Sequence, residues 1–336
     1  GKFTEVRQTV DIAQVGISSV NTTRPWLDST GTWTKLTYNT ELRDDDSLYP
    51  GTGGDVTLKA NKKYIIVWGV SAYHPSAGAR MCFINRLSIN GIIRQAGSGY
   101  QRTLASQGPP TRGMYLHEVG ASDETAFLEA TLETEIAVTG DPLVNKAYMQ
   151  ILELPDSAEW VHGDNGAVDS LTTTLAGTAT WYNTPLGSVA RADSTGDLLV
   201  DIATNEILNE SLASMPVLAI GWHRWDRDSG TSGVRKNPWA AWNNNGSRLG
   251  YGIAGAYSRG QQSVTDTWQC AYTSVAVMDV APNTGLQFQV NDESSAANAA
   301  MAVYASTNRH FLGMQVLNLN TLGAIPTVIR RIFLIT

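Results

Sequence analysis

The sequence has few residues suited to covalent cross-linking or metal binding. It contains two cysteines in 336 residues, Cys82 and Cys270, and neither has a second cysteine or a histidine at metal-ligand spacing. This excludes a disulfide scaffold and the common zinc motifs. Both cysteines are therefore expected to be small buried hydrophobes.

Positive charge is also scarce. Charged residues make up 16% of the chain, and 24 basic against 31 acidic side chains give a net charge of −7. No net positive field draws such a chain to a phosphate backbone or to an anionic bilayer. We therefore expect neither nucleic acid nor a membrane as a partner.

Long hydrophobic runs and helical patterns are missing as well. The longest apolar stretch, residues 64–70, is far shorter than the roughly 20 residues that cross a bilayer. The sequence does not open with a basic segment followed by an apolar one, so no export signal is expected. Residues 200–212 and 122–130 come nearest to a helical stripe, and both also fit a strand followed by a turn.

The chain does contain an internal repeat. Residues 64–69 (Tyr-Ile-Ile-Val-Trp-Gly) correspond to residues 217–222 (Val-Leu-Ala-Ile-Gly-Trp), and residues 147–154 correspond to residues 312–319. The offset is 153 for the first pair (217 minus 64) and 165 for the second (312 minus 147), with three further matching blocks in between. Insertions accumulate in loops while strands stay in step, so a growing offset indicates a duplicated domain.

The repeat predicts two domains with an extra piece at each end of the chain. The copies span residues 31–155 and 177–320, and the polar, glycine-rich residues 156–176 are predicted to be a linker. The N-terminal arm, residues 1–30, and the C-terminal strand, residues 321–336, look like lone strands. Such strands pair within their own chain, which we favour, or with a neighbouring chain. The candidate assembly residues in them are Val6, Val10, Ile12, Val328, Ile329 and Ile332.

Both copies carry the signals of antiparallel sheet. The matching blocks are short and rich in β-branched and aromatic residues, and turn signals such as Asn90-Gly91 separate them. Apolar residues alternate with polar ones at Leu286, Phe288 and Val290. The sequence therefore predicts an all-β fold of two tandem antiparallel jelly-roll sandwiches with terminal strand extensions.

Motifs for catalysis or cofactor binding are weak. Residues 250–255 have the spacing of a dinucleotide fingerprint, but they follow an asparagine-rich turn, which favours a glycine-rich strand. His223 and the carboxylates near it are interpreted as a charge-paired surface loop rather than an acid–base site. Residues 44–46, three aspartates, are interpreted as a solvated turn rather than a calcium loop. We predict no catalytic residue, no cofactor and no metal, although carboxylate pairs brought together in space stay open.

Tryptophan is the unusual residue type. Four of the ten tryptophans lie between positions 222 and 242 of the second copy. Such rings fill a core, pack against a subunit, or stack on sugars. Core or subunit packing is favoured, with Trp222 and Trp239 facing inward and Trp225 and Trp242 as the more exposed pair. All four are kept as candidate contacts with a partner or a glycan.

Each repeat resembles the jelly roll of the TNF and C1q-like family. The resemblance covers most of residues 31–155 and is weaker over 177–320, where the early strand looks degenerate. It rests on an early tryptophan-bearing strand at 32–36, an acidic loop at 44–46, the apolar strand at 64–69, the strand leading to Asn90-Gly91, and the last strand at 147–154. The resemblance implies a non-enzymatic and usually trimeric protein, and similar barrels decorate phage capsids and tail tips.

These observations predict a structural protein of a phage or virus particle, made in the host cytoplasm and located on the particle surface. The favoured role is capsid decoration or cement, with the chain assembling with itself as a homotrimer and contacting capsid or other virion proteins. One alternative is a head or tail fibre tip that binds a receptor or host-surface glycan. Another is a double jelly-roll major capsid protein, and a secreted enzyme has no residue that favours it.

Overall fold

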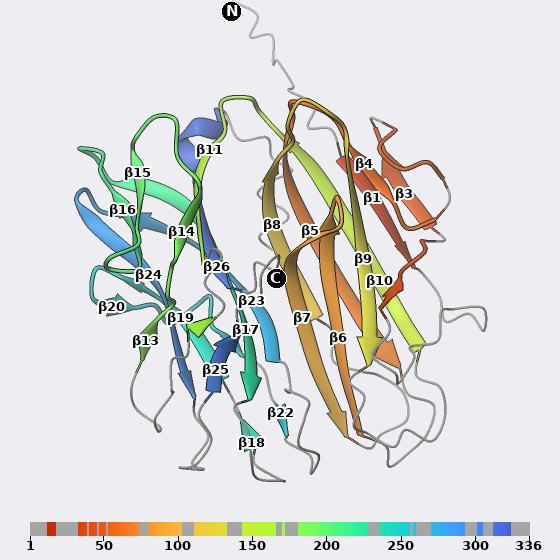
Figure 1. Cartoon of the computed structure of the whole chain (residues 1–336). Helices are drawn as coiled ribbons and strands as arrows, with labels where there is room; N and C mark the ends of the chain where they lie inside the picture. Colours follow the sequence, from red (N-terminus) through yellow and green to blue (C-terminus); the bar gives the residue numbers. More distant parts are fainter. Residues whose placement is uncertain are drawn as a thin grey trace, which may run out of the picture.

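The computed structural model contains two β-sandwiches, one from each half of the chain (Figure 1). All strand pairs among the described residues are antiparallel, which confirms the predicted all-β fold. The described residues are 12–17, 33–38, 40–45, 47–51, 53–73, 80–102, 111–132, 143–165, 170–171, 181–227, 235–236, 238–255, 258–259, 270–292, 301–304 and 312–323.

Sandwich 1 packs two sheets face to face. Sheet A has the strand order β3 (Thr40–Asp44), β1 (Ile12–Ile17), β10 (Leu143–Leu154), β5 (Lys63–Tyr73), β8 (Thr111–Glu118). Sheet B has the order β2 (Thr34–Lys35), β9 (Glu124–Leu132), β6 (Arg80–Ile89), β7 (Ile92–Arg102), with β4 (Val56–Leu58) also paired to β9. The first and last strands of the sandwich lie side by side in sheet A, which is the arrangement of a jelly roll.

Sandwich 2 repeats this arrangement. Sheet C has the order β12 (Ser170–Leu171), β25 (Met301–Tyr304), β17 (Met215–Arg227), β26 (Gly313–Asn318), β11 (Glu159–Asp164), β14 (Ser188–Arg191), with β23 (Cys270–Val280) also paired to β17. Sheet D has the order β15 (Leu198–Asp201), β16 (Glu206–Asn209), β24 (Thr284–Asp292), β19 (Pro238–Asn244), β20 (Ser247–Arg248), with β13 (Tyr182–Asn183) on β24 and β21 (Ala254–Gly255) on β19. β18 (Arg235–Lys236) pairs with β22 (Ser258–Arg259).

Among the described residues the single helix is a short 3-10 turn, η1 (Leu319–Leu322). No helix in this part of the chain is long and apolar enough to cross a membrane.

Five strands of one sheet correspond between the two halves. The order β14-β11-β26-β17-β23 in sheet C matches β3-β1-β10-β5-β8 in sheet A. Trp68 pairs with Met149 across β5 and β10, and Gly221 pairs with Met314 across β17 and β26. These pairs give the offsets of 153 and 165 found in the sequence, so the repeat is a repeat of structure.

Each repeat begins earlier than the sequence pattern indicates. β1 pairs with β10 through Ala13 and Ile151, and β11 pairs with β26 through Val161 and Val316. β1 lies in the predicted arm, and β11 lies inside the predicted linker at residues 156–176. This part of the linker prediction is wrong, because residues 159–164 form a strand of sheet C.

The N-terminal strand pairs within its own chain, as favoured from the sequence. Ile12 is the first residue of this strand. The other candidate assembly residues, Val6, Val10, Val328, Ile329 and Ile332, lie outside the described residues.

The early strand of the second repeat is present, with two residues like its counterpart in the first. Thr34 of β2 pairs with Ala130, and Tyr182 of β13 pairs with Val290 at the corresponding position of β24. Trp33 and Trp181 therefore precede equivalent strands. An arginine lies over each ring, Arg86 at 3.8 Å and Arg248 at 4.1 Å from the ring centroid. The expectation of a degenerate early strand is wrong.

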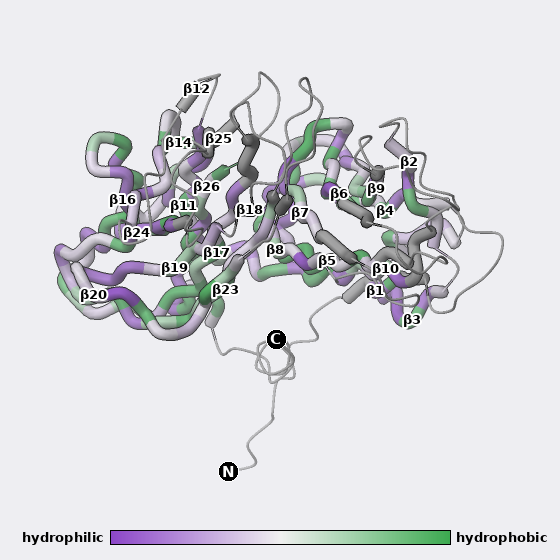
Figure 2. Tube along the Cα trace, turned by 90° about the horizontal axis from the view of Figure 1, so that it is seen from below, coloured by the Kyte–Doolittle hydropathy of each residue, from purple (hydrophilic) through white to green (hydrophobic). Residues whose placement is uncertain are grey.

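The sandwiches lie side by side, and the hydropathy of their strands alternates along the chain (Figure 2). β7 and β8 at one edge of sandwich 1 contact β23 and the neighbouring part of sheet C. In β17 the odd-numbered residues from Val217 to Gly221 face the core of sandwich 2, and Leu218, Ile220 and Trp222 face outward into the core cluster of sandwich 1. The two domains are therefore joined by buried apolar surface.

Candidate functional site

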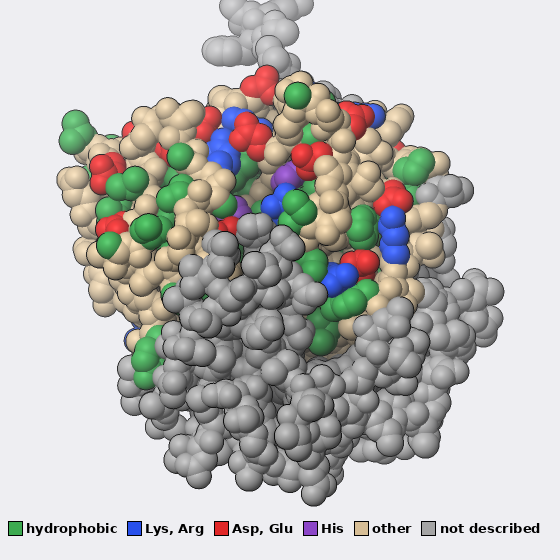
Figure 3. All heavy atoms as spheres, viewed as in Figure 1, with side chains coloured by type: hydrophobic (Ala, Val, Ile, Leu, Met, Phe, Trp, Pro, Cys, Tyr) green, Lys and Arg blue, Asp and Glu red, His purple; other side chains and the backbone are tan. Residues whose placement is uncertain are grey.

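The strongest constellation of polar and aromatic side chains is the contact between the edge of sandwich 1, β7 and β8, and the outer face of sheet C. We call this contact the seam. Charged and histidine side chains gather at the surface between the two lobes there (Figure 3).

One glutamine closes the edge of β8. The Gln315 Nε2 donates to the Leu116 carbonyl at 2.8 Å, and the Gln315 Oε1 accepts from the Leu116 amide at 2.8 Å. A second contact of this kind joins Ser98 on β7 to Ala271 on β23, whose amide donates to the Ser98 Oγ at 2.7 Å. The two side chains satisfy backbone groups that an edge strand otherwise leaves unpaired.

An aromatic cluster fills the middle of the seam. The Tyr115 ring lies 5.7 Å from Trp222 and 5.9 Å from His162, and His162 lies 5.4 Å from Trp222. Tyr115 comes from sandwich 1, whereas His162 and Trp222 come from β11 and β17 of sandwich 2. Edge-on contacts of this kind stabilise an interface beyond the area they bury.

Buried ionisable groups line the same region. His117 Nε2 lies 2.7 Å from Glu124 Oε2, yet desolvation outweighs the carboxylate and lowers the pKa of His117 below its usual value. Burial raises the pKa of Tyr115 to about 12. Asp164 is 1% exposed and accepts a 2.5 Å hydrogen bond from Ser188 Oγ. At neutral pH both His117 and Tyr115 are therefore uncharged, and this cluster is suited to packing and hydrogen bonding.

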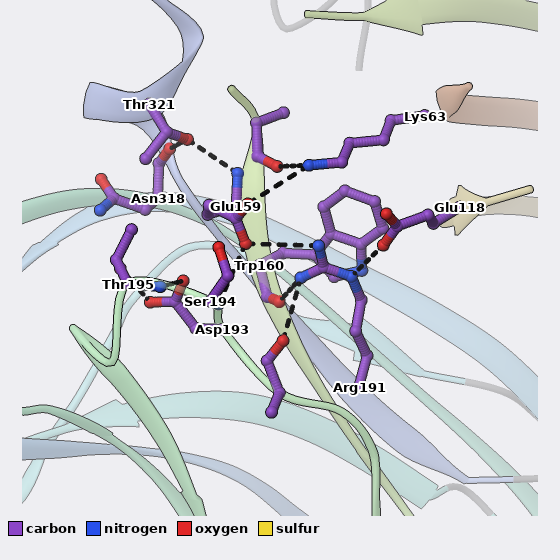
Figure 4. A network of polar contacts seen from close by, with 12 residues as sticks. Lys63, Glu118, Glu159, Trp160, Arg191, Asp193, Ser194, Thr195, Asn318 and Thr321 are labelled. Carbon is purple, nitrogen blue, oxygen red and sulfur yellow. Dashed lines mark hydrogen bonds and ion pairs between the residues drawn. The ribbon is translucent and has the colours of Figure 1, made fainter. Parts of the chain in front are cut away.

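A charged cluster, which we call the clamp, closes one end of the seam (Figure 4). The Arg191 guanidinium stacks on the Trp160 ring, with 3.8 Å between its central carbon and the ring centroid, and donates to the Trp160 carbonyl. Its Nε lies 2.7 Å from Glu118 of sandwich 1, and its Nη2 lies 3.3 Å from Glu159 of sandwich 2. A planar cation thus ties both domains to one indole ring.

Lys63 approaches the clamp from sandwich 1. Its Nζ donates to the Asp156 and Ala158 carbonyls at 2.7 Å each and lies 3.3 Å from Glu159. Burial alone would raise the pKa of Glu159, but hydrogen bonds from Ser194 and the two cations lower it below its usual value. Glu159 therefore stays ionised at the centre of the clamp.

The structure divides the four candidate tryptophans. Trp222 is 1% exposed at the seam, and Trp242 is fully buried in sandwich 2, where its Nε1 donates to Ser274 Oγ at 3.0 Å. Trp239 is half-buried, and Trp225 lies in β17 with its side chain outside the described part of the chain. The expectations of an exposed Trp242 and of an inward-facing Trp239 are both wrong, because residues three apart on a strand face opposite sides of the sheet. Neither Trp222 nor Trp242 can stack on a sugar without unfolding its surroundings.

His223 is a core residue rather than part of a surface loop, which corrects the sequence interpretation. It is 1% exposed, stacks on Tyr272 and meets Phe288 edge-on at 4.9 Å. The Thr184 hydroxyl donates to the Phe288 carbonyl at 2.6 Å and lies 2.5 Å from His223 Nε2, so Nε2 carries the proton. Burial lowers the pKa of His223 to about 3.

The remaining motifs also have structural roles. Asp44 accepts hydrogen bonds from the Leu48 and Tyr49 amides, which fixes the turn after β3. In the glycine-rich segment 250–255, Gly252 has φ +66° and its carbonyl accepts a hydrogen bond from the Ser274 hydroxyl of β23. Within the described ranges no three His, Cys, Asp or Glu side chains are grouped so that they could hold a metal.

The sequence itself matches no family model and no curated protein. The globular domain of zebrafish complement 1qA protein is structurally similar over 43% of this chain and 94% of its own, with 14% identity and a TM-score of 0.28. The structure of the Macrobrachium rosenbergii nodavirus is similar over 92% of this chain and 95% of its own, with 8% identity and a TM-score of 0.21.

The CBM22-1-CBM22-2 tandem domain from Paenibacillus barcinonensis Xyn10C is similar over 90% of this chain and 99% of its own, with 13% identity and a TM-score of 0.16. Similarities of this size say nothing about function. The strand pairing described above establishes the two-sandwich fold independently.

Proposed function

We propose that the chain is a non-enzymatic structural protein on the surface of a phage or virus particle. Its role is capsid decoration or cement, and it assembles with itself as a homotrimer. The seam supports this proposal, because its aromatic, amide and charged side chains are used to hold two sandwiches together as one body. A rigid body suits a protein that works by bridging neighbours.

One surface feature carries the proposal of docking on a coat protein. The hairpin β15–β16 and the turn after it expose three large apolar side chains, Leu199, Ile202 and Leu212, and Leu212 is 94% exposed. A contiguous exposed apolar patch marks an interaction surface, and we propose that these three side chains contribute to one such patch. Among the described strands, sandwich 1 has β4 in the place of β16 and no counterpart of β15. The hairpin therefore gives one end of the duplicated body a distinct surface.

The mechanism is mechanical. Apolar area buried between the hairpin and neighbouring coat subunits favours the closed shell, as a ligand that binds one state stabilises that state. The bound protein raises the free energy needed to separate the subunits that it spans. No bond is made or broken in this activity.

Particle binding tests the proposal. Leu199→Asp and Leu212→Asp should fold normally, yet their occupancy on purified particles should fall at least tenfold, as measured by quantitative mass spectrometry of the particles. Ile92→Asp, which alters another exposed apolar residue, serves as the matched control and should bind fully. Full occupancy of the two leucine variants, or absence of the wild-type chain from particles, would contradict the proposal.

The fusion of two equivalent sandwiches in one chain also favours a second candidate, a double jelly-roll major capsid protein. Such a chain would form closed shells without another coat protein, whereas a decoration protein needs a preformed shell. Electron microscopy of the purified chain alone distinguishes the two functions.

A further inference from the structure

The outer face of sheet A carries the same glutamine with which sheet C holds its neighbour. Gln150 pairs with Val67 in sheet A, and Gln315 pairs with Ile220 in sheet C, at equivalent positions of the two ladders. Gln315 is 1% exposed because sandwich 1 covers it, whereas Gln150 is only half-buried. The glutamine of sheet C is therefore covered by a neighbouring sandwich, whereas the equivalent glutamine of sheet A is accessible to a partner.

The outer faces of sheets A and C also carry an aromatic ring at equivalent cross-strand residue pairs. In sheet C this is Trp222, which lies over its partner Gly313, and a Cβ there would come within 2.7 Å of the indole. In sheet A the ring is on the other strand, because Tyr148 lies over its partner Gly69, where a Cβ would come within 2.4 Å of the phenol ring. Tyr148 is half-buried, so part of this ring is accessible.

The arginine of the clamp has a counterpart as well. Arg43 pairs with Gln14 and Arg191 pairs with His162, and in both sheets the register shifts immediately after this pair. Arg191 reaches Glu118 of the neighbouring sandwich, and Arg43 lies near the edge of sheet A, its side chain 48% exposed and paired with Asp45.

A matching edge is present on sandwich 2. Leu116 of β8 lies opposite Ile65, and Val277 of β23 lies opposite Leu218 at the equivalent position. The backbone amide and carbonyl of Ala271 point away from β17, toward Ser98. Backbone groups of a strand point to alternate sides along the chain, so the amide and carbonyl of Val277 also point away from β17. Val277 is 42% exposed.

The acidic residue of the clamp is repeated on this edge too. Asp279 is exposed two residues beyond Val277, as Glu118 lies two residues beyond Leu116.

From this correspondence we infer that the end of the β23 edge at Val277 and Asp279 docks on the outer face of sheet A of a second copy, while the Ala271 end stays bonded to Ser98 of its own chain. The contact repeats between chains the contact that β8 makes with sheet C inside the chain. In this contact the Gln150 side chain forms hydrogen bonds with the backbone amide and carbonyl of Val277. Arg43 forms an ion pair with the Asp279 carboxylate. The inference rests on the self-assembly in the proposed function and assigns its surfaces.

Such a contact is head to tail, because the two surfaces are different. Contacts of this type close into rings when the rotation allows it. A ring of three chains would place six sandwiches around one axis, with intrachain and interchain seams alternating.

A charge swap tests the inference on the full-length chain. Arg43→Glu and Asp279→Arg should each raise the dissociation constant of self-association at least tenfold in sedimentation equilibrium. The double variant should recover most of the affinity, because the new carboxylate of one copy meets the new cation of the next. Glu210→Arg, another exposed acidic residue, is the matched control and should associate like the wild type. Circular dichroism checks that each variant is folded.

The outcomes separate the inference from the proposed function. If the wild type associates and both single variants associate equally well, or if the double variant is no better than the singles, the docking surfaces are wrong and self-assembly stands. If the wild type stays monomeric at every concentration, self-assembly and the inference both fail. Gln150→Ala gives an independent readout, with an expected loss of affinity of about tenfold.

Discussion

The two sandwiches place the same two residue types in opposite order at one point of equivalent strands. β5 has Trp68-Gly69, and β17 has Gly221-Trp222. Trp68 is buried in the core of its own sandwich, against the space left by Gly113. In sandwich 2 the glycine faces the core, where Phe288 covers it, and the tryptophan faces the seam.

This difference shows how little sequence change separates a core residue from an interface residue. Successive side chains of a strand point to opposite faces, so exchanging two neighbours moves the large ring from one face to the other. The fold tolerates the exchange because another ring fills each vacated place, Phe288 inside sandwich 2 and Tyr148 outside sandwich 1. In sandwich 2 the ring on the outer face is the one against which Tyr115 of sandwich 1 packs.

The largest expected effect is that of Trp222→Ala. Removal of a fully buried ring costs about 3–5 kcal/mol, and here the cavity opens between the domains. We expect two separate unfolding transitions in calorimetry, where the wild type shows one. Trp68→Ala, with its cavity inside sandwich 1, is the control and should lower the stability of sandwich 1 without separating the domains. A single transition for Trp222→Ala, with less than about 1 kcal/mol lost, would contradict this account.

The second effect concerns pH. Because the pKa of His223 is lowered from 6.5 to about 3, only the unfolded chain binds this proton between these values. The stabilisation is complete above pH 6.5 and is lost as the pH falls toward 3, by about 1 kcal/mol per pH unit.

Urea unfolding at a series of pH values measures this slope. His223→Gln, which retains an amide that can reach Thr184, should unfold with a slope reduced by one proton. The lowered pKa of His117 acts in the same direction, so part of the slope should survive in the variant. An unchanged slope would show that His223 is protonated in the folded state.

The third prediction concerns the stability lost when each of the two equivalent glutamines is replaced. Gln315→Ala leaves the Leu116 amide and carbonyl without their partner, and we expect a loss of about 2–3 kcal/mol in the free energy of unfolding. Gln150→Ala, at the equivalent position of sheet A, should cost less than about 0.5 kcal/mol in the isolated chain. Equal costs in chemical denaturation of dilute protein would remove the distinction between a covered and an accessible face.

The smallest expected effect is the stability lost when each of the two equivalent arginines is replaced by lysine. Arg191→Lys keeps the charge but loses the stack on Trp160 and the paired contacts, and we expect a loss of about 1 kcal/mol. The exposure of Glu118 limits the Coulomb contribution. Arg43→Lys should leave the stability of the monomer unchanged within about 0.3 kcal/mol in thermal unfolding. A larger loss at Arg43 than at Arg191 would reverse the comparison.

The repeat and the all-β fold could be predicted, because strands that are buried on one face keep a clear alternation. β11 could not, since every one of its residues from Glu159 to Asp164 is buried. Its position between two sheets removes the alternation, and its histidine, glycine and aspartate look like a loop. The prediction for His223 is wrong for another reason, because the charged residues that follow it in the sequence are typical of a surface loop.

The sequence also could not predict which residues of β19 face the core. Trp239 and Trp242 are three residues apart and so face opposite sides of the sheet, but the alanines between them give no sign of which side is the core. The seam itself depends on partners far apart in the chain, such as Gln315 and Leu116. No local pattern of residues indicates such a contact.

The Gln315 contact has a consequence for synthesis. The backbone groups of Leu116 receive their partner from a residue 199 positions later. On the ribosome, the N-terminal sandwich is therefore complete while its β8 edge is still open, and an open edge can pair with other nascent chains. The β8 edge is covered only when the second sandwich has been translated. Slow translation or truncation between the two halves should therefore increase aggregation.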